Sequence, residues 1–224
     1  MKIIAHRGGA KEAFENSFEA IQHAIDIGAD SIEVDLRQTA DGEIVVFHDE
    51  TVDRLTDHHG KLLDFRAIEI KLKNGSRIPT LKELLRLTKS KISLHLEVKE
   101  RGFEAKLVKM LSKNSVVVIS FDTAVLRKIH KLKPTVKTGF LFAKKTDLKD
   151  CPDFCDLILP NFRLINPKLM DWAKANRKKV HVWTVNDLKT AKKLSALGVN
   201  GLITDVPRKI AAVLSSSSDN TSCR

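Results

Sequence analysis

Short apolar runs alternate with amphipathic segments along most of the chain. Runs typical of strands occur at Lys2–His6, Ser31–Arg37, Ile44–His48, Ile92–Val98, Val116–Phe121, Thr138–Phe142, Leu157–Pro160, Val180–Val185 and Gly201–Thr204. Segments with the apolar spacing of helices lie between most of them, at Ser17–Gly28, Leu81–Leu87, Phe103–Ser112, Ala124–Leu132, Pro167–Asn176, Leu188–Leu197 and Pro207–Leu214. Strands that alternate with helices indicate βαβ units and a parallel sheet.

The number of these units favours a closed barrel over an open sheet. If Ile44–His48 forms a hairpin with the strand before it, eight βα units remain, which fits a (β/α)8 TIM barrel with a short insertion after strand two. No G-x-G-x-x-G turn follows the first strand, which weakens the case for a dinucleotide-binding fold. No linker interrupts residues 1–214, so we expect a single domain there, followed by a disordered Ser-rich tail at 215–224.

Polar and apolar residues alternate within two of the expected strands. Glu33 and Asp35 share one face of Ser31–Arg37, and Glu97 lies on the polar face of Ile92–Val98. In a barrel the apolar faces pack on the outer helices, so these carboxylates should point inward near the C-terminal mouth. Three carboxylates with open positions suit a divalent cation such as Mg²⁺ or Ca²⁺.

Basic residues near these carboxylates leave a second interpretation open. Arg7, Arg37 and Lys99 could neutralise the three acids in a network without a metal, because buried charges need partners. Arg7 and Lys99 are equally suited to holding a phosphate group, and arginine can bind two of its oxygens at once.

Two histidines end strands on the same side of the expected barrel. His6 ends the first strand and precedes Gly8 and Gly9, which allow the backbone to approach a ligand closely. His48 ends Ile44–His48. An imidazole titrates near neutral pH, so such a pair can act as general base and general acid. Trp183 also faces inward near a strand end, as core packing or as a wall for a substrate.

Composition limits the class of protein and its partners. The chain has 42% hydrophobic and 30% charged residues, which is typical of a soluble globular protein. Its net charge of +11 is uneven: residues 1–60 carry −8 and residues 61–224 carry +19. The basic part indicates either solvated lysine-rich helices or a field that attracts anionic substrates.

Cysteines and termini give little sign of export. Cys151, Cys155 and Cys223 form neither a disulfide framework nor a zinc motif, which favours a reducing cytoplasm. The apolar run at the N-terminus is too short for a signal peptide, and no run reaches the length of a transmembrane helix.

An ordered series of motifs resembles the glycerophosphodiester phosphodiesterase family. The series spans nearly the whole chain and consists of His6-Arg7-Gly8-Gly9, Phe14-Glu15-Asn16-Ser17, Ile32-Glu33-Val34-Asp35, Thr39-Ala40-Asp41-Gly42, Val46-Phe47-His48-Asp49, Val52-Asp53-Arg54-Leu55-Thr56, Ile78-Pro79-Thr80-Leu81, Leu96-Glu97-Val98-Lys99, Ser120-Phe121, Trp183-Thr184-Val185-Asn186 and Gly198–Pro207. Phe14 stands where the family has proline, which leaves the chemistry unchanged.

The resemblance implies a (β/α)8 barrel that hydrolyses glycerophosphodiesters to sn-glycerol 3-phosphate and an alcohol. Carried over by motif, the implied roles are as follows: Glu33, Asp35 and Glu97 bind a divalent cation, His6 and His48 are the acid/base pair, Arg7 and Lys99 hold the phosphate, Trp183 lines the glycerol side, Glu15 lies near the metal and Asn16 has a structural role. The choice between Mg²⁺ and Ca²⁺, the head group and the oligomeric state stay open.

Other functions compete with this one. A lysophospholipase D or a related lipid phosphodiesterase would use the same site with a wider mouth, although no amphipathic anchor helix is evident. A nucleic-acid binder is disfavoured because the basic residues are scattered and few aromatic residues are available for stacking. A Schiff-base aldolase using Lys99 is disfavoured because Glu97 on the same strand face would raise the lysine pKa. We therefore expect a small-molecule partner, no nucleic acid and no stable membrane insertion.

Overall fold

The apolar runs predicted as strands form the wall of a closed barrel in the computed structural model, which describes residues 1–111 and 115–215. Within those residues eight parallel strands pair in the order β1-β9-β8-β7-β6-β5-β4-β2, and β2 pairs with β1 to close the ring. Their bounds are β1 Lys2–His6, β2 Ser31–Gln38, β4 Ser93–Val98, β5 Val116–Ser120, β6 Lys137–Phe142, β7 Leu157–Pro160, β8 Lys179–Val182 and β9 Gly201–Thr204. The predicted (β/α)8 barrel is confirmed.

The hairpin after strand two is also present. Strand β3 (Ile44–Val46) pairs antiparallel with the end of β2, with Leu36 opposite Val46. It is two residues shorter than predicted: the backbone N–H of Val46 bonds to Pro79 of the following segment, and that of Phe47 bonds to Asp35 just beyond the strand's end. His48 therefore lies on a connecting segment and not in a strand.

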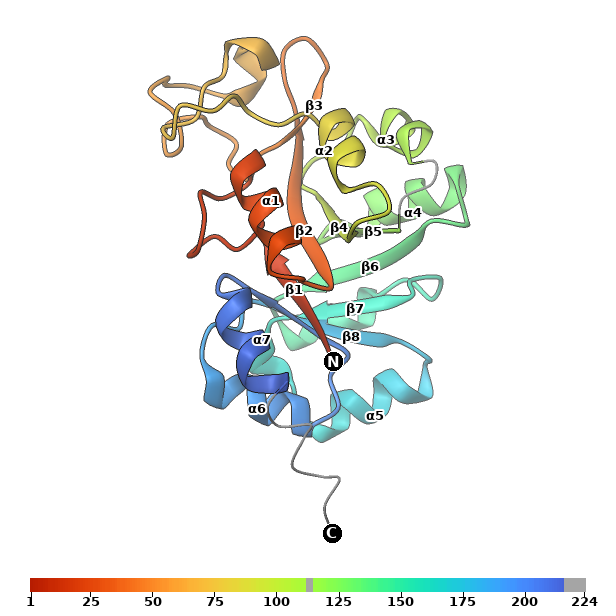
Figure 1. Cartoon of the computed structure of the whole chain (residues 1–224). Coiled ribbons are helices and arrows are strands. Elements are labelled where there is room, and N and C mark those ends of the chain that lie inside the picture. The colour runs from red at the N-terminus through yellow and green to blue at the C-terminus, as the bar shows by residue number, and fades with distance from the viewer. Residues whose placement is uncertain (112–114, 216–224) are drawn as a thin grey trace.

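The amphipathic segments cover the outside of the barrel (Figure 1). The helices are α1 Phe18–Asp26, α2 Leu81–Thr88, α3 Glu104–Met110, α4 Thr123–Leu132, α5 Pro167–Ala175, α6 Leu188–Ala196 and α7 Pro207–Ser215. Ser17 caps α1 through its side chain, which accepts a hydrogen bond from the backbone N–H of Ala20. The connection from β6 to β7 instead contains a short 3-10 helix, Lys145–Asp150.

Two apolar shells fill the fold. The outward faces of the strands pack against the helices, as Ile32 and Leu96 do in one cluster with Ile21 of α1 and Leu107 of α3. The inward faces meet in a separate layer across the middle of the barrel, which contains Ile4, Ile119, Leu141, Leu157, Leu159 and Ile203. This inner layer divides the barrel interior into two ends, of which the C-terminal end carries the predicted site.

Residues 49–79 form the insertion, which lies beside the β2–β3 hairpin (orange to yellow in Figure 1). It contains two 3-10 helices, Leu62–Asp64 and Ala67–Glu69. Its own small core joins Phe47 and Val45 of the barrel to apolar side chains of the insertion, such as Ile70. This packing fixes the segment that carries His48 against the barrel.

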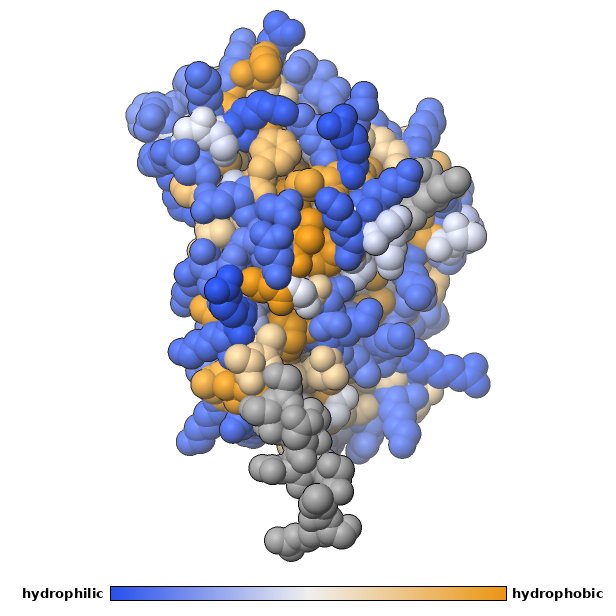
Figure 2. All heavy atoms as spheres, viewed as in Figure 1, coloured by the Kyte–Doolittle hydropathy of each residue, from blue (hydrophilic) through white to orange (hydrophobic). Residues whose placement is uncertain are grey.

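Polar side chains dominate the face shown in Figure 2, with a narrow strip of hydrophobic residues near its middle. Among the described residues, none of the helices is both long enough and apolar enough to span a bilayer. Ser215 ends α7, and the rest of the predicted tail, 216–224, lies outside the described residues.

Candidate active site

The turn after β1 is shaped by a close approach to α1. Gly8 has φ +85°, and a Cβ there would lie 2.5 Å from the Cβ of Ala20 and 2.7 Å from its carbonyl carbon. Arg7 also has a positive φ, of 51°, and its backbone N–H donates to Glu33 at 3.2 Å. Only glycine fits the tight position, and the turn it permits directs Arg7 toward the carboxylates.

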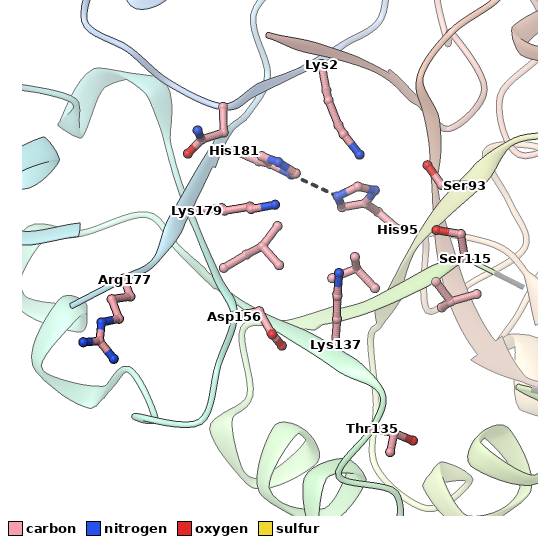
Figure 3. A pocket seen from close by; sticks show the side chains of 14 residues that line it. Lys2, Ser93, His95, Ser115, Thr135, Lys137, Asp156, Arg177, Lys179 and His181 are labelled. Atoms are coloured by element: carbon pink, nitrogen blue, oxygen red, sulfur yellow. Dashed lines mark hydrogen bonds between the residues drawn. The ribbon is translucent and has the colours of Figure 1, made fainter. Parts of the chain in front are cut away.

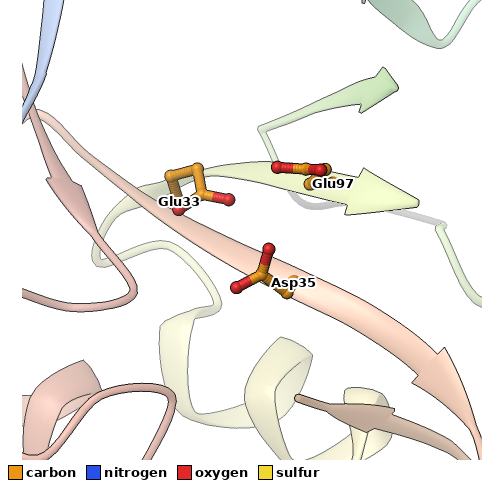
Figure 4. A group of neighbouring side chains, drawn as sticks. All are labelled: Glu33, Asp35 and Glu97. Atoms are coloured by element: carbon orange, nitrogen blue, oxygen red, sulfur yellow. The ribbon is translucent and has the colours of Figure 1, made fainter. Parts of the chain in front are cut away.

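Glu33 and Asp35 on β2 and Glu97 on β4 converge at the C-terminal mouth (Figure 4). One ligand oxygen of each lies within 4.8 Å of the others, and all three residues are buried. Two of their buried oxygens, Oε1 of Glu33 and Oδ1 of Asp35, accept no hydrogen bond. Buried carboxylate oxygens that lie close together and accept no hydrogen bond are the donor set that a hard divalent cation requires, so the residues fit such an ion.

Burial and crowding perturb these acids strongly. Burial, reinforced by the charge of Asp35, raises the pKa of Glu33 to about 8. Burial also acts to raise the pKa of Asp35, but the charges of Arg7 and Lys99 outweigh it and lower that pKa. Like charges in a buried site repel unless a cation is added, which is a second reason why the cluster fits a divalent ion.

Both predicted phosphate-binding cations lie beside the cluster. Lys99 donates from Nζ to Oε1 of Glu97 at 2.6 Å and lies 3.5 Å from Oδ1 of Asp35. Nε of Arg7 lies 3.2 Å from Oδ2 of Asp35. Arg37, by contrast, pairs with Glu100 and donates to the backbone oxygen of His48. Arg37 thus supports the segment next to the site.

The two residues expected beside the site have different surroundings. Asn16 is buried with φ 53° and donates to Oδ2 of Asp35 at 2.9 Å. Glu15 lies outside the carboxylate cluster, where it accepts hydrogen bonds from Arg7 and from both Nη atoms of Arg54. Glu15 therefore orients Arg7 and anchors the insertion to the mouth.

His6 is held by a carboxylate from the far end of the chain. Its Nδ1 lies 2.6 Å from Oδ1 of Asp205, and its Nε2 faces Glu33 at 3.8 Å. Burial by itself would lower the pKa of His6, but the hydrogen bond with Asp205 and the charge of Glu33 outweigh it, so the pKa is raised. Asp205 is in turn held by the amide of Asn186.

His48 also contacts a carboxylate through Nδ1, but the charge of that carboxylate is partly neutralised by an arginine. Its Nδ1 lies 2.6 Å from Oδ1 of Asp49, whose other oxygen accepts from Nε of Arg54. Arg54 therefore neutralises much of the charge that faces this imidazole. Burial lowers the pKa of His48, and the nearby carboxylates do not compensate.

A cavity of about 230 Å³ joins these groups to an apolar wall. Trp183 borders this cavity, and its Nε1 donates to the backbone oxygen of Leu159. The ring of Phe121 packs edge-on against the ring of Trp183, with centroids 5.5 Å apart. The full lining is His6, Arg7, Glu33, His48, Glu97, Lys99, Ile119, Phe121, Leu141, Trp183, Thr184 and Ile203. The arrangement has a charged side suited to a phosphate and an apolar side suited to carbon atoms.

Sequence reasoning assigned no role to Asp205, Asp49 or Arg54, although all three lie in the quoted motifs. Side chains of a strand alternate between its two faces, and Ile203 of β9 faces the barrel interior. Asp205 lies two residues after Ile203, so the same alternation could have predicted that it faces the site. No pattern along the chain indicates that Arg54 meets Glu15.

A test of the carboxylate cluster needs no substrate. In EDTA we expect the contribution of Glu33 to make the free energy of unfolding fall between about pH 4.5 and pH 8, by at most about 1.4 kcal/mol per pH unit, and to level off above that range. The folded protein keeps a proton on Glu33, because the pKa there is raised to about 8, whereas the unfolded chain has already lost it. Urea unfolding at several pH values measures the slope. Glu33→Gln should make it shallower, and an equal slope in that variant would contradict the assignment.

Comparisons with known proteins agree with this geometry. A sequence model of the Glycerophosphoryl diester phosphodiesterase family matches residues 6–209. A glycerophosphodiester phosphodiesterase from Caldanaerobacter subterraneus is 34% identical, over 93% of this chain and 95% of its own. The structure of an Oleispira antarctica phosphodiesterase in complex with the product sn-glycerol-3-phosphate has a TM-score of 0.88 at 26% identity and covers 96% of this chain and 97% of that one. A glycerophosphodiester phosphodiesterase from Thermotoga maritima has a TM-score of 0.84 at 25% identity, with 95% and 98% covered.

The barrel and the relatives that share it define an enzyme that hydrolyses phosphoric diesters. The class is thus a phosphodiesterase built on a (β/α)8 scaffold. Within that class, the chain belongs to the glycerophosphoryl diester phosphodiesterase family, as its motifs implied.

Proposed function

We propose that the protein hydrolyses glycerophosphodiesters to sn-glycerol 3-phosphate and an alcohol, using a divalent cation and the pair His6 and His48. One observation carries the proposal: both imidazoles border the same cavity as the carboxylate cluster and the two cations Arg7 and Lys99. The Oleispira antarctica relative, described in complex with sn-glycerol-3-phosphate, supports the choice of product.

Glu33, Asp35 and Glu97 would hold the cation, which supplies positive charge that neutralises the phosphate and favours deprotonation of the attacking oxygen. Arg7 and Lys99 bind the remaining phosphate oxygens. Trp183 and Phe121 contact the glycerol carbons and exclude water on that side.

The two histidines divide the proton transfers. His48, whose pKa is lowered, accepts a proton from the attacking hydroxyl, either of water or of the glycerol moiety. The oxygen attacks phosphorus, and the bond from phosphorus to the alcohol oxygen breaks. His6, whose pKa is raised by its contact with Asp205 and the charge of Glu33, donates a proton to the departing alkoxide. If the glycerol hydroxyl attacks, water then opens the cyclic phosphate.

The direct test is hydrolysis of glycerophosphocholine and glycerophosphoethanolamine by purified protein with Mg²⁺, Ca²⁺ or EDTA. A coupled glycerol 3-phosphate dehydrogenase measures the product. We expect release of glycerol 3-phosphate that depends on a divalent cation. Folded protein that releases none with either cation would remove the proposed substrate class.

A lipid substrate is the second candidate, and one observation favours it. Phe121 is 46% exposed at the cavity mouth beside Trp183, where an acyl chain could lie. Release of choline from lysophosphatidylcholine, compared with release from glycerophosphocholine, distinguishes a lysophospholipase D from the proposed enzyme.

Further proposals concern the setting of the enzyme. We place it in the cytoplasm, since Cys151 and Cys155 are free thiols. We propose a small-molecule partner, with no nucleic acid and no stable insertion into membranes, and a single catalytic domain over residues 1–214.

A further inference from the structure

A second cavity opens at the opposite end of the barrel (Figure 3). Its volume is about 570 Å³, within the range of small-molecule sites. It is bordered by the amino ends of the strands, where Lys2, Lys137 and Lys179 are the first residues of β1, β6 and β8. Strands β1, β8 and β6 are every second strand in this part of the ring. In such a barrel the inward side chains of alternate strands form one layer, and the three lysines point inward in this way.

The charge of this cavity is strongly unbalanced. Figure 3 shows Lys2, Lys137 and Lys179 directed toward its centre, and Arg177 lies at its rim. Among residues 1–111 and 115–215, no carboxylate forms an ion pair with any of these four cations. Asp156 is the single acid in the lining, and its Oδ2 already accepts the backbone N–H of Thr138. The four cations therefore have no ion-pair partner among the described residues, and Asp156 is too little charge to balance them.

Two buried histidines form the floor. Nε2 of His95 lies 3.0 Å from Nδ1 of His181, and Nδ1 of His95 lies 2.8 Å from Oγ of Ser31. Ser31 donates its hydroxyl proton to the backbone oxygen of Ser93. His95 must then donate to Ser31, and His181 must donate to His95. Nε2 of His181 is left without a partner among the described groups.

The strand framework makes room for this floor. A Cβ at Gly201 would lie 2.8 Å from the imidazole of His181, so only glycine permits the ring at that position. Burial and the charges of Lys2 and Lys179 lower the pKa of His181 to about 4, which keeps the ring neutral near pH 7. An anion in the cavity would meet three ammonium groups, with the neutral ring of His181 beneath them close enough to sense its charge.

We propose that the cavity at the N-terminal end of the barrel binds a small phosphate-bearing polyanion between the ammonium groups of Lys2, Lys137 and Lys179, above the ring of His181. This site is separate from the candidate active site, because the inner apolar layer that includes Ile4 and Leu157 lies between them. Several cations that converge beside a single carboxylate fit a multiply charged anion better than a carboxylic acid. The concave shape favours a small molecule over a membrane surface or a nucleic-acid duplex.

The test uses the intact protein with ¹³C-labelled histidine rings. Pyrophosphate is titrated at constant ionic strength against sodium chloride, and inorganic phosphate is titrated separately. His95 and His181 report on the proposed site, and His6 and His48 report on the active site. We expect saturable shifts of the His95 and His181 resonances with pyrophosphate, weaker ones with phosphate, and none with chloride.

Matched variants show whether the lysines cause the binding. Lys137→Gln with Lys179→Gln should weaken pyrophosphate binding at His181 by at least about tenfold, since two charge-assisted contacts are lost. Lys189→Gln with Lys192→Gln, on the exposed face of α6, changes the net charge equally and should leave affinity unchanged. If the first double variant fails to fold, Lys179→Gln alone serves.

Three outcomes would overturn the proposal. The His181 resonance could shift only in proportion to ionic strength, or both double variants could bind pyrophosphate equally. Alternatively, vesicles of phosphatidylglycerol could shift the same resonances while pyrophosphate does not, which would make the face a membrane-binding surface.

Discussion

His48→Ala is expected to lower kcat for glycerophosphocholine by about 10²- to 10⁴-fold, the usual contribution of a general base. The imidazole borders the cavity, its pKa is lowered, and its Nδ1 is oriented by Asp49. Steady-state kinetics at saturating substrate and cation measure the loss. His59→Ala, in an exposed part of the insertion, is the control and should retain full activity.

His6→Ala is expected to cause a loss of similar size, but the loss should depend on the leaving group. A poor leaving group such as choline needs the proton that His6 donates, whereas p-nitrophenolate leaves without one. The variant should therefore recover most of its rate on the p-nitrophenyl ester of glycerol phosphate, and His48→Ala should not. Equal losses on both substrates in both variants would contradict this division of roles.

The contact between His6 and Asp205 can be tested separately. Asp205→Asn removes the charge that holds the proton on His6 but keeps a hydrogen-bonding group in place. We expect the basic limb of the kcat profile to move to lower pH, because the pKa of His6 falls without that carboxylate. An unchanged profile with unchanged kcat would show that Asp205 has only a structural role.

Removal of the divalent cation is expected to have the second large effect. EDTA should lower kcat by at least about 10³-fold, because a bound cation contributes several kcal/mol of transition-state stabilisation. The same treatment should lower stability by about 2.7 kcal/mol relative to protein with cation at 100 times its Kd. Readdition of Mg²⁺ or Ca²⁺ should restore both properties, and the better ion identifies the natural one.

Carboxylate variants show whether the effect of EDTA arises at the proposed site. Asp35→Asn and Glu97→Gln should lose the rise in melting temperature that the cation produces, as well as activity. Glu100→Gln, a nearby acid that pairs with Arg37, is the matched control and should retain both. Full activity of the protein in EDTA would overturn the metal-dependent mechanism.

Much of the fold could be predicted because the barrel repeats one local pattern. The strand runs and the helical spacing placed seven helices within a few residues of their observed bounds. The errors lie where strands end: the run to Val185 stops at Val182, and the run to His48 stops at Val46. Strand ends depend on where the neighbouring strand offers hydrogen bonds, and a single run of residues contains no information about its neighbour.

The candidate site could be predicted in part for the same reason. The period-two alternation predicted that Glu33, Asp35 and Glu97 share the inward face, and the order of the motifs indicated His6 and His48 as the acid/base pair. The alternation did not reveal how the charges pair. Arg37 has the right parity yet bonds to Glu100, whereas Arg7 reaches Asp35 through a turn with positive φ.

The sequence by itself determined the barrel, the face of each strand that points inward and the types of residue at its C-terminal mouth. Only the tertiary structure decided which distant residues meet: Asp205 with His6 across 199 positions, and His95 with His181 across 86. The physical reason is that side-chain direction along a strand is a local property with a period of two. Distances between strands depend on register and ring closure, which the whole chain sets together.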